Sequence, residues 1–200
     1  MVTAGNYSAI SGSWTAPAAQ GNGSSTSADA SWIGIGGVTS DDLIQVGSQN
    51  TVSASGQVST SAFYELLPNT AQTIQTVKVS PGDSLKASLT EIGSNLWTIF
   101  IADNTTGQSF SLNVSYTSSN SSGEWIEEDP SYASGGLIPF DNFGTVDFSS
   151  GSVTSGGSAM DILEAKPSSI TMVSSSGQVI AQPSSLSSDG AGFLVSRQNN

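Results

Sequence analysis

Four carboxylates fall within six residues in the segment 124–129, Glu-Trp-Ile-Glu-Glu-Asp, although the chain is otherwise poor in charge. Alternate side chains of an extended strand point to the same face, so Glu124, Ile126 and Glu128 are predicted to share one face. Pro130 cannot donate to a ladder and should end the strand. A carboxylate at the end of a rigid strand beside apolar side chains is a candidate acid or base. A solvated acidic edge strand that resists pairing is the alternative interpretation.

The chain of 200 residues contains neither cysteine nor histidine. The missing cysteine excludes disulfides, thiol nucleophiles and thiolate metal sites. The missing histidine excludes imidazole metal ligands and every Ser-His or Cys-His catalytic arrangement. Catalysis, if present, must therefore use carboxylates, amides, hydroxyls or lysine, and we expect no metal and no cofactor.

The charge balance is strongly acidic, with 4 basic residues, 16 acidic residues and a net charge of −12 at pH 7. Such a balance disfavours nucleic-acid binding, which needs a basic surface, and adhesion to anionic membranes. In an acidic medium most carboxylates become protonated, and so few cations leave little self-repulsion. The composition therefore predicts tolerance of acid, visible as a melting temperature that stays flat through the acid range.

The distribution of apolar residues predicts one all-β domain over residues 1–200. Val, Ile, Thr and aromatic residues stand in short runs separated by Ser/Gly-rich turns at a spacing of about 10 residues, which is typical of an antiparallel β-sandwich of the concanavalin A-like or jelly-roll type. No stretch is long and apolar enough to span a membrane, and the start lacks the basic and apolar segments of a signal peptide. The predicted strands are 9–17, 31–37, 42–48, 61–68, 73–79, 84–90, 97–101, 108–114, 124–129, 146–148, 170–173, 178–180 and 192–195.

Two of these strands carry a polar residue inside an apolar run, Gln45 in one and Glu65 in the other. By alternation Phe63 lies on the face of Glu65, and Trp32 heads a similar face on its own strand. An unpaired polar group in a core costs about 1–3 kcal/mol, so these side chains fit a cleft on a concave sheet better. A structural amide remains an equal alternative for Gln45, and an exposed or structural acid is favoured for Glu65.

Seven segments of the chain resemble, in order and spacing, those of the glutamic peptidases (eqolisins), especially the cysteine-free prokaryotic members. This resemblance implies a β-sandwich endopeptidase that acts in acid, outside the cell and as a monomer, on protein or peptide substrates. The segments are 10–17, 31–37, 43–47, 62–68, 124–128, 138–146 and 183–190.

The resemblance implies that Gln45 and Glu128 form the catalytic pair. Glu128 would take a proton from the attacking water and later return it to the leaving amine. Gln45 would orient the water and donate a hydrogen bond to the developing oxyanion, and its amide cannot titrate. A base that stays ionised in acid needs a low pKa, so a low pKa is expected for Glu128.

The remaining site residues follow from the same comparison. Trp32, Phe63 and Glu65 are expected to line the substrate cleft. Tyr7 stands where the family has an early tryptophan and is expected to join them. Gly36 stands where fungal members have an acid, which removes a partner for Glu65.

Two other functions fit the same architecture. A glycoside hydrolase would use Glu65 and Glu128 as its carboxylate pair. A carbohydrate-binding module would use Trp32 and Phe63 as stacking platforms and would not need Glu128. The joint presence of Gln45 and Glu128 in family-like strands favours the peptidase.

Overall fold

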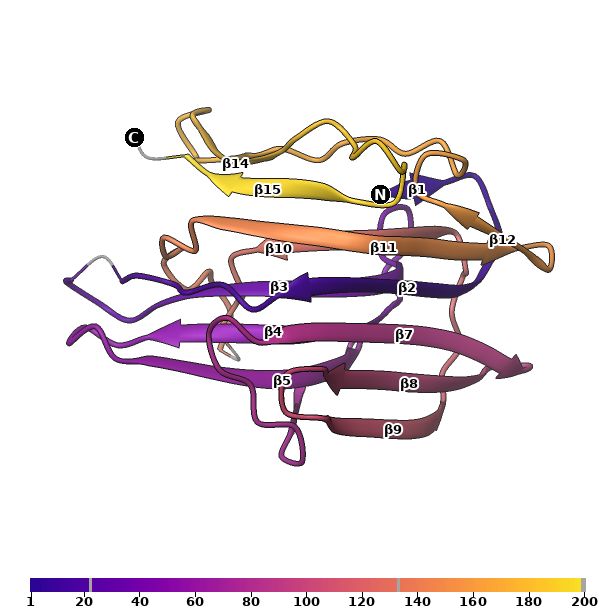
Figure 1. Cartoon of the computed structure of the whole chain (residues 1–200), viewed down its shortest axis with the longest axis horizontal. Coiled ribbons are helices and arrows are strands. Elements are labelled where there is room, and N and C mark those ends of the chain that lie inside the picture. The colour runs from indigo at the N-terminus through magenta and orange to yellow at the C-terminus, as the bar shows by residue number, and fades with distance from the viewer. Residues whose placement is uncertain (22, 133, 199–200) are drawn as a thin grey trace.

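The computed structural model describes residues 1–21, 23–132 and 134–198, which form two antiparallel sheets and no helix (Figure 1). The predicted antiparallel β-sandwich is confirmed. The first sheet has the order β1 (Val2–Thr3), β10 (Ser122–Glu128), β3 (Ser27–Gly36), β4 (Leu43–Val52), β5 (Val58–Leu66) and β6 (Gln72–Ile74). The second has the order β13 (Met172–Val173), β14 (Val179–Pro183), β15 (Phe193–Arg197), β11 (Thr145–Ser155), β2 (Tyr7–Thr15), β7 (Ser84–Gly93), β8 (Leu96–Asp103) and β9 (Gln108–Ser115), with β12 (Ser158–Asp161) paired to β11.

The main core fills the space between the two sheets, because alternate residues of each strand point inward. Ile33 of β3 and Ile44 of β4 are fully buried there opposite Leu89 of β7. Trp125 of β10 crosses to the second sheet, where its indole Nε1 donates to the main-chain oxygen of Ser11 at 2.9 Å. These contacts fix which face of β10 is internal.

A second, smaller apolar cluster covers the outer face of the first sheet. Trp32, Leu43 and Phe63 are its large buried members, and Ile126 packs against them. The predicted shared face of Glu124, Ile126 and Glu128 is confirmed by this arrangement. The alternative of a solvated acidic strand is wrong, because Glu124 is only 3% exposed.

The sequence pattern missed the short strands β1 and β12 and the second half of β11. Residues 149–155 read Ser-Ser-Gly-Ser-Val-Thr-Ser, which lacks an apolar alternation, yet they pair with β2 on one side and β12 on the other. The predicted strand 73–79 reduces to β6, because its valines are buried from a turn rather than from a strand. Among the described residues we find no helix that could cross a membrane.

Candidate active site

The predicted site residues lie on adjacent strands of the first sheet, and the strand register sets their order. Gln45 of β4 pairs with Glu65 of β5 on one side and with Gly34 of β3 on the other. The paired residues that share this face of the sheet form rows across the strands. Trp32 lies in the row next to that of Gln45, and Glu128 of β10 lies in the row after it. Gln45 and Glu128 are therefore separated by one strand and by the row of Trp32.

The Gln45 side chain is held by Glu65. Its Nε2 donates to Oε2 of Glu65 at 2.5 Å, and its Oε1 is buried without a partner. Burial raises the pKa of the Glu65 carboxyl, and the hydrogen bond from Gln45 opposes that rise. The amide of Gln45 thus has a fixed orientation, and its second N–H remains available to donate.

The Glu128 carboxyl is held by Trp32, whose indole Nε1 donates to Oε1 at 2.9 Å. Burial raises the pKa of Glu128 to about 7, the Trp32 hydrogen bond opposes the rise, and repulsion from Asp129 and Glu65 adds to it. The expected low pKa is therefore wrong, because the carboxylate loses more hydration than one hydrogen bond restores. In acid Glu128 holds its proton.

Trp32 can reach across the site because two glycines make room for it. A Cβ at Gly34 would lie 2.7 Å from the Trp32 ring, and one at Gly47 would lie 2.5 Å from the Trp32 Cβ. The indole therefore covers the row of Gln45 at one edge and bonds Glu128 with its nitrogen. Phe63, the cross-strand neighbour of Gly47, extends the same apolar floor.

Two residues discussed from the sequence behave differently from the rest. Tyr7 is buried in the main core on β2, where its hydroxyl donates to the main-chain oxygen of Thr3 at 3.0 Å. The predicted contact of Tyr7 with substrate is wrong, because its side chain faces the space between the sheets. Gly36 has a φ of 90°, and a Cβ there would lie 2.5 Å from the main-chain oxygen of Asp42, so this backbone admits no acid at that position.

A cavity of about 1090 Å³ adjoins Glu128 and Trp32. Its lining includes every residue from 124 to 128, together with residues of the segment 162–170 and of the strands β13 to β15. Gln45, Glu65 and Phe63 lie outside its lining and face the open side of the same sheet.

Three further carboxyls meet inside the sandwich, and the sequence pattern did not associate them. Asp29 of β3 accepts from Nδ2 of Asn50 at 3.0 Å and lies beside the carboxyls of Glu127 and Asp141. Burial raises the pKa of all three acids, and the neighbouring Asp29 raises those of the other two further. Like charges this close disfavour one another, so the cluster keeps protons that the same acids release in water.

The comparisons with known proteins agree with this fold. Residues 1–192 match the model of the peptidase A4 family. Aspergillopepsin-2 of Aspergillus niger is 34% identical over 136 residues, which cover 66% of this chain and 48% of that protein. Scytalidopepsin B of Scytalidium lignicola is 28% identical over 171 residues, which cover 80% of this chain and 64% of that protein. The matched part thus spans about half to two thirds of these relatives.

Solved structures show the same architecture. Scytalido-glutamic peptidase, crystallised with a peptide-based transition-state analogue, superposes with a TM-score of 0.82 at 24% identity, covering 98% of this chain and 95% of that one. Aspergilloglutamic peptidase from Aspergillus niger superposes with a TM-score of 0.75 at 28% identity, covering 86% of this chain and 99% of that one. The chain belongs to the peptidase A4, or eqolisin, family.

Proposed function

We propose that this protein is an endopeptidase that hydrolyses peptide bonds in acid, with Glu128 and Gln45 as its catalytic residues. The observation that carries the proposal is the half-buried Glu128 carboxyl, which Trp32 fixes beside a large cavity and on the face that also presents Gln45. A group held in this way can transfer protons to and from a substrate that lies over Trp32.

The protonation state of Glu128 sets the order of the proton transfers. Since Trp32 donates to Oε1, that oxygen is an acceptor and the proton of the neutral acid lies on Oε2. As water attacks the scissile carbonyl carbon, one water proton passes to Oε1 while the Oε2 proton passes to the carbonyl oxygen. The product is a neutral tetrahedral diol, and Glu128 is again a neutral acid.

The second half of the reaction reverses these roles. The proton on Oε1 moves to the amide nitrogen as the carbon–nitrogen bond breaks, and a diol hydroxyl returns a proton to Oε2. The products are a carboxylic acid and an amine, and Glu128 regains its starting state. No free hydroxide or carboxylate is required, which suits an acidic extracellular medium better than a neutral compartment.

Gln45 stabilises the carbonyl oxygen during these steps. Its Nε2 has one N–H engaged with Glu65 and a second that can donate to the oxygen as charge develops on it. Glu65 is then a positioning residue, because it fixes the amide rather than touching the substrate carbonyl.

Digestion of a denatured protein at acid pH tests the proposal, with wild type compared to Glu128→Gln and Gln45→Ala. Glu128→Gln should lower kcat/KM by at least about 10²-fold, the usual contribution of an acid–base residue. Gln45→Ala should lower it by about 10²–10³-fold. Glu91→Gln on β7 makes the same chemical change in the other sheet and should leave the rate unchanged. Cleavage that survives both site substitutions would refute the proposal.

A further inference from the structure

Most of the outer edge of β10 has no paired strand among the described residues. β1 pairs with it at two positions only, Val2 with Gly123 and Thr3 with Ser122. From Glu124 to Glu128 the described part of the chain provides no strand on that side. An unpaired edge presents main-chain N–H and C=O groups in the geometry that another strand needs.

The direction of these main-chain groups follows from one hydrogen bond two strands away. The Leu67 N–H donates to the main-chain oxygen of Leu43 at 2.9 Å, so the main chain of Leu43 points toward β5. In an antiparallel strand the N–H and C=O of a residue point to one side and those of its neighbour to the other. The main-chain N–H and C=O of Ile44 therefore point toward β3, and those of its partner Ile35 point back toward β4. Those of Gly34, the next residue, point toward β10.

The same alternation continues across β10. Glu124, the partner of Gly34, directs its main chain toward β3, as do the residues two and four further on. Trp125 and Glu127 consequently direct their N–H and C=O groups to the unpaired edge. Neither residue takes part in the main-chain hydrogen bonds found outside the strand ladders.

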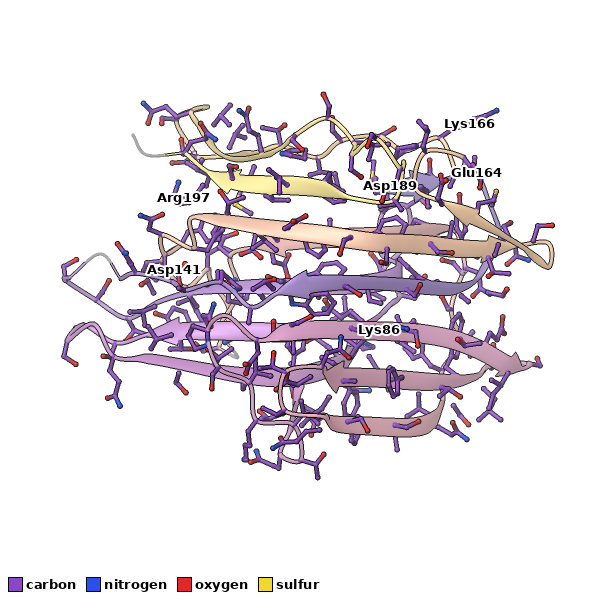
Figure 2. The ribbon with its side chains drawn as sticks, in the orientation of Figure 1. Lys86, Asp141, Glu164, Lys166, Asp189 and Arg197 are labelled. Carbon is purple, nitrogen blue, oxygen red and sulfur yellow. The ribbon has the colours of Figure 1, made fainter. Side chains whose placement is uncertain are left out.

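The cavity beside Glu128 gives access to this edge. Trp125 and Glu127 belong to its lining although their side chains point into the sandwich core, which places their main chain at the cavity wall. The opposite wall is apolar and is formed by Ile162, Leu163, Ile170, Met172 and Leu186. Lys166 at the end of this wall projects outward (Figure 2).

We propose that the edge of β10 is a strand-addition site for the substrate, in which an extended peptide pairs with the main chain of Trp125 and Glu127 on its way to Glu128. The inference rests on the proposed peptidase function and adds an extended subsite to it. The occupant is the substrate because the cavity is continuous with Glu128 and Trp32. The two residues lie within about 10 Å of Glu128 along the strand, so the peptide residues about three to five positions from the scissile bond would make these contacts.

The apolar wall defines the chemistry of the peptide. Side chains that alternate toward Ile170 and Leu186 should be aliphatic or aromatic, while those on the other face meet solvent. The volume of about 1090 Å³ exceeds the usual size of a small-molecule pocket and leaves room for several residues.

Backbone N-methylation of a peptide substrate tests the pairing directly. We would measure kcat/KM for a set of long peptides, each methylated at one nitrogen, on both sides of the scissile bond. On one side, methylation should lower kcat/KM by about fivefold at every second position and have no effect at the positions between, because only alternate N–H groups face β10. A uniform effect, or none, on both sides would overturn the inference.

A steric block provides the second test. Ser169→Trp places an indole at the cavity wall, and Ser175→Trp makes the same change at an exposed serine outside the lining. Ser169→Trp should lower the ratio of kcat/KM for long over short peptides, whereas Ser175→Trp should not. If no peptide is cleaved, the peptidase proposal fails; if cleavage persists without the length and period-two effects, only the subsite fails. A dimer in solution that Ser169→Trp dissociates would assign the edge to a second copy instead.

Discussion

The cluster of Asp29, Glu127 and Asp141 makes the stability of the fold fall as pH rises. In the unfolded chain these acids ionise near pH 4. In the folded chain burial and mutual repulsion raise the pKa of each. A group with a raised folded pKa contributes its full stability below the unfolded pKa and loses it as pH rises through the folded pKa.

The size of the effect follows from proton counting. Each proton that the folded state keeps and the unfolded state has released lowers the free energy of unfolding by about 1.4 kcal/mol per pH unit. Three such protons give a slope of at most about 4 kcal/mol per pH unit just above pH 5, which becomes smaller as the cluster ionises. Total stabilities are only about 5–15 kcal/mol, so a slope of this size is large enough to measure.

Urea unfolding at a series of pH values, followed by tryptophan fluorescence, measures this slope. Asp141→Asn removes one titrating proton at nearly constant shape and should reduce the loss of unfolding free energy by about 1.4 kcal/mol per pH unit. Asp147→Asn removes the same charge from an exposed position on β11 and should leave the slope unchanged. A wild-type stability that stays flat from about pH 4 to 7, or identical slopes for the two variants, would refute the reasoning.

Four shorter predictions concern the site and its surroundings. The reaction should require protonated Glu128, so a plot of log kcat/KM against pH should have a descending limb that falls tenfold per pH unit above about 7. A descending limb that begins near pH 4 would contradict a protonated Glu128. Trp32→Phe removes the hydrogen bond that favours the ionised form of Glu128, so the limb should move up by about one unit while the rate drops; an unmoved limb would argue against that contact. Burial raises the pKa of Glu124 to about 8, so Glu124→Gln should stabilise the fold by about 3 kcal/mol at pH 7 and by almost nothing at pH 4, as read from urea midpoints. Gly36→Asp must hold a φ of 90° against the backbone of Asp42 and should destabilise by at least about 1–3 kcal/mol; unchanged thermal melting would show that the loop can relax.

Much of the fold was predictable because a strand with one face in a core must alternate its residues. The period of two in 124–128 predicted which acids share a face, and the structure confirms it. The pattern failed where pairing alone makes a strand, as in the serine-rich half of β11. The family resemblance failed at Tyr7, because a match in sequence position does not specify which face of β2 is internal.

The sequence by itself determined the class of fold and the groups available for chemistry, because residue alternation and the absence of histidine and cysteine are local properties of the chain. Only the tertiary structure decided how those groups behave. The pKa of Glu128 depends on how much water the surrounding residues exclude, and these come from separate parts of the sequence. The meeting of Asp29 with Asp141 depends on a loop that returns 112 residues later to the same end of the sandwich. Hydration and through-space charge act over distances in space, so they follow from the packed fold and not from spacing along the chain.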